Sequence, residues 1–187
     1  MRKVALCVGH YYHVYNRGVN RQPICFSEEN RVFFIKRLRY YCRPELVDVV
    51  AYCLMPTHYH LLVYLKTDVF SKRVMQPFGV SYTKAINCQQ NRVGPLFQGP
   101  FKAKLVDQEA YLIHLTRYIH LNPVSAGLVR SPDEWSYSSY RDYIGQRQGT
   151  FPYPDVVLAE FASREGYQEF VESGEDVSRS VEHLLFD

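Results

Sequence analysis

The chain has 187 residues and a formal net charge of +3, and 47% of its residues are hydrophobic and 22% charged. This composition is typical of a globular protein and argues against long disordered segments, and no segment is apolar enough over a sufficient length to span a membrane. The five cysteines lie far apart, without the spacing of a metal site, which predicts reduced thiols of a cytoplasmic protein rather than a disulfide framework.

Charge is distributed unevenly along the chain. Residues 1–150 contain 20 Lys and Arg against 10 Asp and Glu, whereas residues 151–187 contain 2 against 9. A basic body favours a polyanionic partner such as nucleic acid, because binding releases condensed counterions, although many basic domains have no such partner. The acidic segment is interpreted either as a solvated helical appendage or as a cover for the basic body.

The first elements are a strand and a helix. Tyrosine, histidine and valine at residues 10–15 predict a strand that runs into a turn at residues 16–18. Ser27 then has the character of an N-cap, with Glu28 and Glu29 in the first turn of a helix that reaches Pro44.

Two strands follow at residues 47–55 and 58–65, joined by a tight turn, and we expect them to pair antiparallel. Alternation along a strand places His58 and His60 on one face and an entirely apolar set on the other. Two neighbouring imidazoles can hold a divalent metal ion with open coordination positions. A His-x-His strand alone is more often a structural pair.

Three further elements are predicted before residue 123. Residues 70–90 form a helix split or bent by Pro77 and Gly79, and residues 101–106 form a strand with Lys102 and Lys104 on one face. Residues 109–122 form a helix that Pro123 stops.

The last of these helices has two distinct faces. Its core stripe consists of Leu112, Leu115, Thr116 and Ile119. Tyr118 and Asn122 are neighbours at positions i and i+4. His114 and His120 are candidates for proton transfer or phosphate contact, but a solvent-facing helix histidine is the preferred interpretation of each.

This order of elements predicts an α+β fold, a ferredoxin-like antiparallel sheet with helices packed on it and the 109–122 helix added on top. The segment to residue 143, which contains Trp135, is expected to pack across this body. Residues 145–154 have the composition of a linker, and residues 155–186 of two or three short acidic helices. We therefore divide the chain into a main domain, 1–145, and an acidic helical extension, 146–187.

Three segments together resemble the REP-associated tyrosine transposases, which belong to the single-tyrosine branch of the His-hydrophobic-His nuclease superfamily. They are residues 13–18 (HVYNRG), 53–62 (CLMPTHYHLL) and 117–129 (RYIHLNPVSAGLV). Residues 96–99 (LFQG) and 135–140 (WSYSSY) fit the same pattern, so the resemblance extends from residue 10 to about residue 145.

The resemblance implies a metal-dependent enzyme that cuts and joins single-stranded DNA near a hairpin. Tyr118 would attack the phosphorus and leave a 5′-phosphotyrosine and a free 3′-OH, and His58, His60 and the Asn122 carbonyl oxygen would hold Mg²⁺ or Mn²⁺. It implies no small-molecule cofactor, a monomer, and a cytoplasmic location, at the nucleoid when DNA is bound.

Arg17, Arg21, Lys102 and Lys104 are the candidate phosphate contacts, and each is equally well explained as an ordinary surface charge. The sequence departs from the family pattern at Thr57, where Asn is usual, and at Pro100 and Ser125, where Arg is usual, which weakens the expectation of tight DNA binding.

Two other functions stay open at this point. One is a domesticated protein that binds hairpin DNA without cutting it, and the other is a ferredoxin-like RNA-binding module. The second would require exposed aromatic side chains on the central strands rather than paired histidines.

Overall fold

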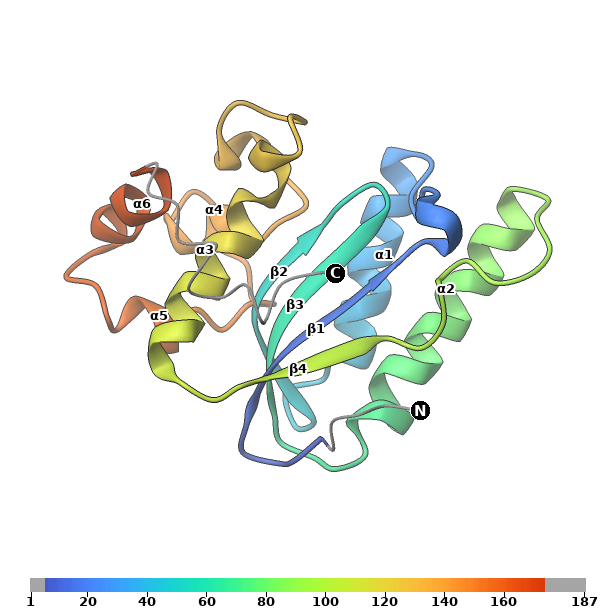
Figure 1. Ribbon diagram of the computed structural model, residues 1–187, viewed down its shortest axis with the longest axis horizontal. Coiled ribbons are helices and arrows are strands. Elements are labelled where there is room, and N and C mark those ends of the chain that lie inside the picture. Colours follow the sequence, from blue (N-terminus) through green and yellow to red (C-terminus); the bar gives the residue numbers. More distant parts are fainter. Residues whose placement is uncertain (1–5, 174–187) are drawn as a thin grey trace.

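The computed structural model describes residues 6–173 (Figure 1). Its centre is a four-stranded sheet in the order β2-β3-β1-β4 in which every neighbouring pair is antiparallel. The strands are β1 (Tyr11–Arg17), β2 (Val47–Leu54), β3 (His58–Leu65) and β4 (Lys102–Val106). With α1 (Glu28–Tyr41) between β1 and β2, and α2 (Gln76–Gln89) between β3 and β4, the predicted ferredoxin-like fold is confirmed.

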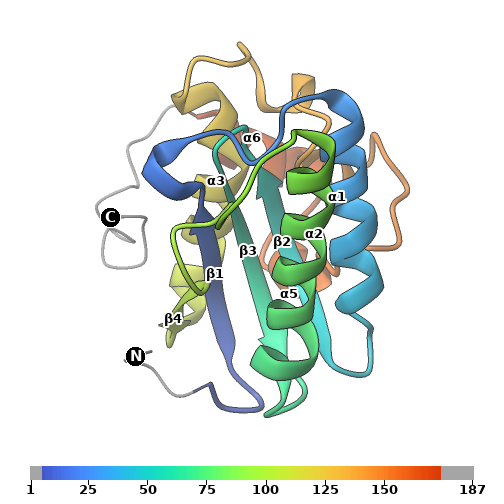
Figure 2. The ribbon, with the colours of Figure 1, turned by 90° about the vertical axis from the view of Figure 1, so that its right-hand side faces the viewer.

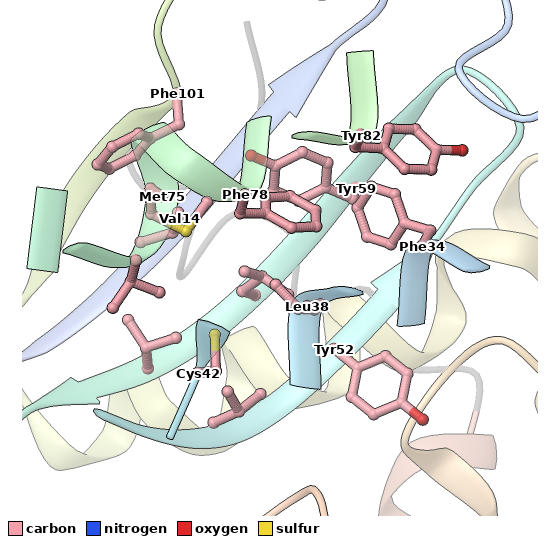
Figure 3. Close-up of a cluster of buried hydrophobic side chains, with 14 of the residues drawn as sticks. Val14, Phe34, Leu38, Cys42, Tyr52, Tyr59, Met75, Phe78, Tyr82 and Phe101 are labelled. Atoms are coloured by element: carbon pink, nitrogen blue, oxygen red, sulfur yellow. The ribbon is translucent and has the colours of Figure 1, made fainter. Parts of the chain in front are cut away.

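Helices α1 and α2 cover one face of the sheet (Figure 2). The alternation of β3 turns Tyr59, Leu61, Val63 and Leu65 toward these helices, as its apolar pattern predicts. Phe34 and Leu38 of α1 and Phe78 and Tyr82 of α2 complete this core (Figure 3).

The other face of the sheet is covered by α3 (Glu109–Ser125), whose predicted core stripe is buried. Behind α3 lie α4 (Tyr140–Tyr143), α5 (Asp155–Leu158) and α6 (Arg164–Glu172), which add apolar side chains to the same core (Figure 1). Helix α3 is therefore packed on two sides, against the sheet and against the C-terminal segment.

Helix boundaries follow local chemistry, with one correction. The Ser27 hydroxyl accepts a hydrogen bond from the Asn30 backbone N–H and caps α1 as predicted. The predicted stop at Pro123 is wrong, since α3 continues to Ser125. A proline has no backbone N–H to donate, but its carbonyl oxygen can still accept a hydrogen bond. The Pro123 carbonyl accepts from the Leu128 backbone N–H at 2.9 Å, and the Asn122 carbonyl accepts from the Ala126 backbone N–H at 3.0 Å.

Short elements join the main ones. A 3₁₀ turn, η1 (Val19–Arg21), follows β1, and another, η3 (Pro132–Glu134), follows α3. The predicted 70–90 helix consists of a π-helical turn, η2 (Ser71–Met75), followed by α2. Pro77 lies in the first turn of α2, directly after the π-helical turn, so its missing N–H falls where one helical hydrogen-bond pattern changes to the other.

The segment predicted as a linker is instead packed on the sheet. Phe151 is buried, and the Tyr153 backbone N–H donates to the Val49 carbonyl of β2 at 2.8 Å. The polar, glycine-containing composition of this segment predicts a linker. Burial of Phe151 and the hydrogen bond to β2, which form only on the folded sheet, hold the segment in place instead. Residues 174–187 of the predicted acidic helices lie outside the described residues, and no described helix is long and apolar enough to cross a bilayer.

Candidate functional site

The candidate site lies on the sheet face that α3 covers. Strand pairing places Arg17 opposite His58 and Tyr15 opposite His60, and these four side chains point to the same face. On the other side of β1, Lys104 lies opposite His13 and Lys102 opposite Tyr15. The pairing of β3, β1 and β4 thus brings histidines and cations together on one surface.

His58 is positioned by a contact at each ring nitrogen. Its Nε2 lies 3.2 Å from Asn122 Oδ1, and its Nδ1 lies 3.0 Å from Thr57 Oγ1. Burial lowers the pKa of His58, a change that the Asn122 hydrogen bond opposes and the positive charge of Arg17 supports. His58 is therefore a neutral imidazole at pH 7.

His60 is fully buried and contacts a residue that our sequence reasoning did not single out. Its Nδ1 lies 2.9 Å from Nε2 of His13, and the two rings are stacked with centroids 5.1 Å apart. Burial, then the proximity of His13 and His58, hold the pKa of His60 well below its usual value. The signal that identifies His13 is the alternation of β1, which puts it on the same face as Tyr15 and Arg17.

Tyr118 of α3 reaches the same place from above the sheet. Its ring lies 5.4 Å from the His60 ring in an edge-on arrangement and 6.5 Å from that of His13. Burial raises the pKa of Tyr118, and a hydrogen bond with Asn122 opposes that effect. The phenol is therefore protonated at neutral pH, and nucleophilic chemistry requires activation.

The donor atoms fit a small divalent cation. Two ligands at right angles, each about 2.1 Å from an octahedral ion, lie about 3.0 Å apart, close to the 3.2 Å that separates His58 Nε2 from Asn122 Oδ1. Because His13 occupies Nδ1 of His60, Nε2 is the nitrogen that would serve as a ligand. Within residues 6–173, no group of three or more His, Cys, Asp or Glu side chains forms a metal-binding arrangement, so a three-residue set here requires the Asn122 amide.

Three of the four predicted cations lie at this surface. Lys102 and Lys104 stand 5.9 and 6.0 Å from the Tyr15 ring centroid, and Arg17 Nε donates to Gln98 Oε1. Arg21 is exposed in η1, the turn that follows β1, and does not belong to the sheet face.

His120 is fully buried, so its assignment as a solvent-facing residue is wrong. It lies on the side of α3 that faces α4 and α6, where Nδ1 is 2.7 Å from the Tyr167 hydroxyl and Nε2 is 2.7 Å from Ser139 Oγ. Burial lowers its pKa to about 3. His114, also predicted to face solvent, is half-buried beside Phe170.

A cavity of about 590 Å³ lies on the opposite side of the sheet, between α2 and residues 95–101. Asn16 of β1 and Tyr59 of β3 are among the residues that line it. They are paired across the two strands, and their side chains point to the sheet face that α1 and α2 cover. The cavity is therefore separate from the histidine surface.

Comparison with known proteins places these features in context. The sequence model of the family described as "Transposase IS200 like" matches residues 7–122. A protein of Haemophilus influenzae, provisionally named REP-associated tyrosine transposase, is 28% identical over 53% of this chain, and the match spans 62% of that protein. A solved structure of a REP-associated tyrosine transposase bound to a REP hairpin matches with a TM-score of 0.57 and 18% identity, covering 82% of this chain and 89% of the other. The resemblance read from the sequence is confirmed, and the structural match supports the fold.

Proposed function

Because the chain belongs to the IS200-like transposase family, we propose that it cuts and rejoins single-stranded DNA beside a hairpin through a covalent 5′-phosphotyrosine on Tyr118. The observation that carries the proposal is the convergence of three groups. The Tyr118 ring, the His60 ring and the His58–Asn122 contact meet at one point between α3 and β3. The names of the relatives, which refer to REP elements and a REP hairpin, support hairpin DNA as the partner.

The reaction needs no external energy source. The Tyr118 hydroxyl gives up its proton to water as its oxygen attacks phosphorus, and the bond from phosphorus to the 3′ oxygen breaks. The 3′ oxygen leaves as a hydroxyl by taking a proton from water, and the 5′ phosphate stays on the tyrosine. Attack by another 3′-OH reverses the step and joins two strands.

His58, His60 and Asn122 would hold Mg²⁺ or Mn²⁺. When bound, the cation supplies positive charge to the oxygens of the scissile phosphate. The protein's own contribution is to orient these ligands. Thr57 and His13 each contact the second ring nitrogen of a proposed ligand histidine, which fixes the direction of its ring.

The DNA backbone would follow the basic edge of the site. Arg17, Lys102 and Lys104 would contact phosphates beside the histidines, and Arg21 would contact the strand beyond the end of β1. The fold of a single chain supplies every residue of the proposed site, which favours a monomer as the species that acts on DNA.

A covalent adduct on a denaturing gel tests the proposal. We expect the wild-type protein, incubated with Mn²⁺ and a hairpin carrying a single-stranded 5′ extension, to form an adduct that Tyr118→Phe does not form. Tyr111→Phe, on the same helix two turns earlier, is the matched control and should retain the adduct. Hairpin binding without any wild-type adduct would instead support the non-catalytic hairpin-binding function.

A further inference from the structure

A chain of buried hydrogen bonds joins α6, α3 and β2. The Tyr167 hydroxyl lies 2.7 Å from Nδ1 of His120, and Nε2 of His120 lies 2.7 Å from Oγ of Ser139. Ser139 Oγ in turn accepts from the Tyr52 backbone N–H at 2.9 Å and lies 3.3 Å from the Tyr52 carbonyl oxygen. The side chains of His120, Tyr167 and Ser139 are all inaccessible to solvent.

The direction of these hydrogen bonds follows from counting protons. If the Tyr167 hydroxyl donates to Nδ1, then Nε2–H donates to Ser139, and the serine hydroxyl donates to the Tyr52 carbonyl. Each polar hydrogen then has an acceptor. The opposite direction leaves the Tyr167 proton without an acceptor among the described residues, so His120 is the neutral tautomer that carries its proton on Nε2.

This chain lies on the far side of α3 from the candidate site. Position 120 is two residues, or about 200°, from both Tyr118 and Asn122. The chain ends on Tyr52, whose neighbour Cys53 pairs with His60 across β2 and β3. It therefore ties the helix that carries Tyr118 to the strand pair that carries the histidines.

We infer that His120 is a positioning residue, which sets where α3 holds Tyr118 and Asn122 relative to His58 and His60. This inference rests on the proposed function, since it concerns the geometry of the proposed nucleophile. The apolar contacts between α3 and the sheet are non-directional and tolerate small shifts of the helix, whereas hydrogen bonds are directional. A displacement of about 1 Å at reacting atoms reduces a rate by about 100-fold.

Four substitutions separate positioning from general stability. Tyr167→Phe removes only the hydroxyl that contacts His120. His120→Gln retains one acceptor and one donor in place of the ring nitrogens, whereas His120→Phe retains neither. The control is Tyr82→Phe, because Tyr82 is also fully buried and donates its hydroxyl to the Ile24 carbonyl at 2.8 Å, but lies on the sheet face opposite α3. Loss of either tyrosine hydroxyl lowers stability, since each takes part in buried hydrogen bonding.

The first measurement is the single-turnover rate of adduct formation at saturating hairpin DNA. We expect Tyr167→Phe to reduce this rate by at least about tenfold with DNA affinity retained. His120→Gln should restore most of the rate lost in His120→Phe, and Tyr82→Phe should keep the wild-type rate despite its lower Tm. Equal losses in Tyr167→Phe and Tyr82→Phe, or no loss in either, would overturn the inference.

The second measurement requires neither metal nor activity. The Tyr118 ring stands edge-on to His60, so a shift of α3 changes the ring-current contribution to the imidazole proton resonances of His60. In metal-free protein we expect Tyr167→Phe to move these resonances and Tyr82→Phe to leave them in place. Unmoved resonances in Tyr167→Phe contradict the positioning role, whereas moved resonances without any wild-type adduct support it and reject the proposed reaction.

Discussion

The buried imidazole of His120 predicts a measurable dependence of stability on pH. The groups that face it are the hydroxyls of Ser139 and Tyr167, the rings of Tyr140 and Tyr143, and, at longer range, the Arg147 guanidinium. No carboxylate is among its described contacts. Burial lowers its pKa from 6.5 to about 3, so the unfolded chain takes up a proton at a pH where the folded chain does not.

The sign and size of the effect follow from this difference. A group with a lowered pKa in the folded state contributes its full stability above the unfolded pKa and loses it as pH falls. Between pH 7.5 and pH 5, protonation of this one imidazole in the unfolded chain costs about 2 kcal/mol of folding free energy. Other groups also titrate in this range, so the comparison that isolates His120 is between the wild type and His120→Gln.

Urea denaturation in the presence of EDTA, at pH 5 and at pH 7.5, provides the assay. We expect the loss of stability between the two pH values to be smaller in His120→Gln than in the wild type by about 2 kcal/mol. Tyr143→Phe removes no group that titrates in this range and should parallel the wild type. If His120→Gln also paralleled the wild type, His120 would be accessible to protons in the folded state, and its buried hydrogen bonds would be refuted.

Three further outcomes are expected. Arg147→Ala leaves the Asp142 carboxylate, whose side chain is 4% exposed, without its guanidinium and should cost about 2–4 kcal/mol in urea denaturation; a cost near zero would show that water replaces the ion pair. Gly18→Ala places a Cβ 2.0 Å from a backbone carbonyl oxygen and should cost about 2 kcal/mol, whereas Gly79→Ala meets no atom within 4 Å and should stabilise α2 slightly. His13→Ala removes the hydrogen bond to His60, the proposed metal ligand, and should weaken Mn²⁺ binding by about 10–100-fold, measured by the electron paramagnetic resonance of free Mn²⁺; unchanged binding would mean that this contact does not orient His60.

The local sequence pattern was sufficient to predict the strands of the sheet and the sheet face on which the candidate site lies. The alternation of β3 separates His58 and His60 from the apolar residues that meet α1 and α2, and the structure has this arrangement. The i and i+4 relation of Tyr118 and Asn122 likewise follows from helix geometry alone. Their distance from the histidines does not, because it depends on how α3 packs across the sheet.

Tertiary packing explains what the pattern missed. The sequence pattern predicts one buried stripe on α3 and a solvent-facing His120, but α4 and α6 bury the second side of this helix. The packing of residues 145–154 likewise depends on their pairing with β2, which their composition does not reveal. His13 was overlooked because its partner is 47 residues away and becomes a neighbour only through strand pairing.

The dependence of α3 on the C-terminal segment has a consequence for the order of assembly during synthesis. The four strands and the two helices of one sheet face are all encoded before residue 107, and their core can form early. The partner of His120 on α6 leaves the ribosome only after another 60 residues or so, at residue 167. A nascent chain would thus present a folded sheet while α3, which carries Tyr118, still lacks its partner on α6, so the proposed cleavage would begin only after α6 has been made.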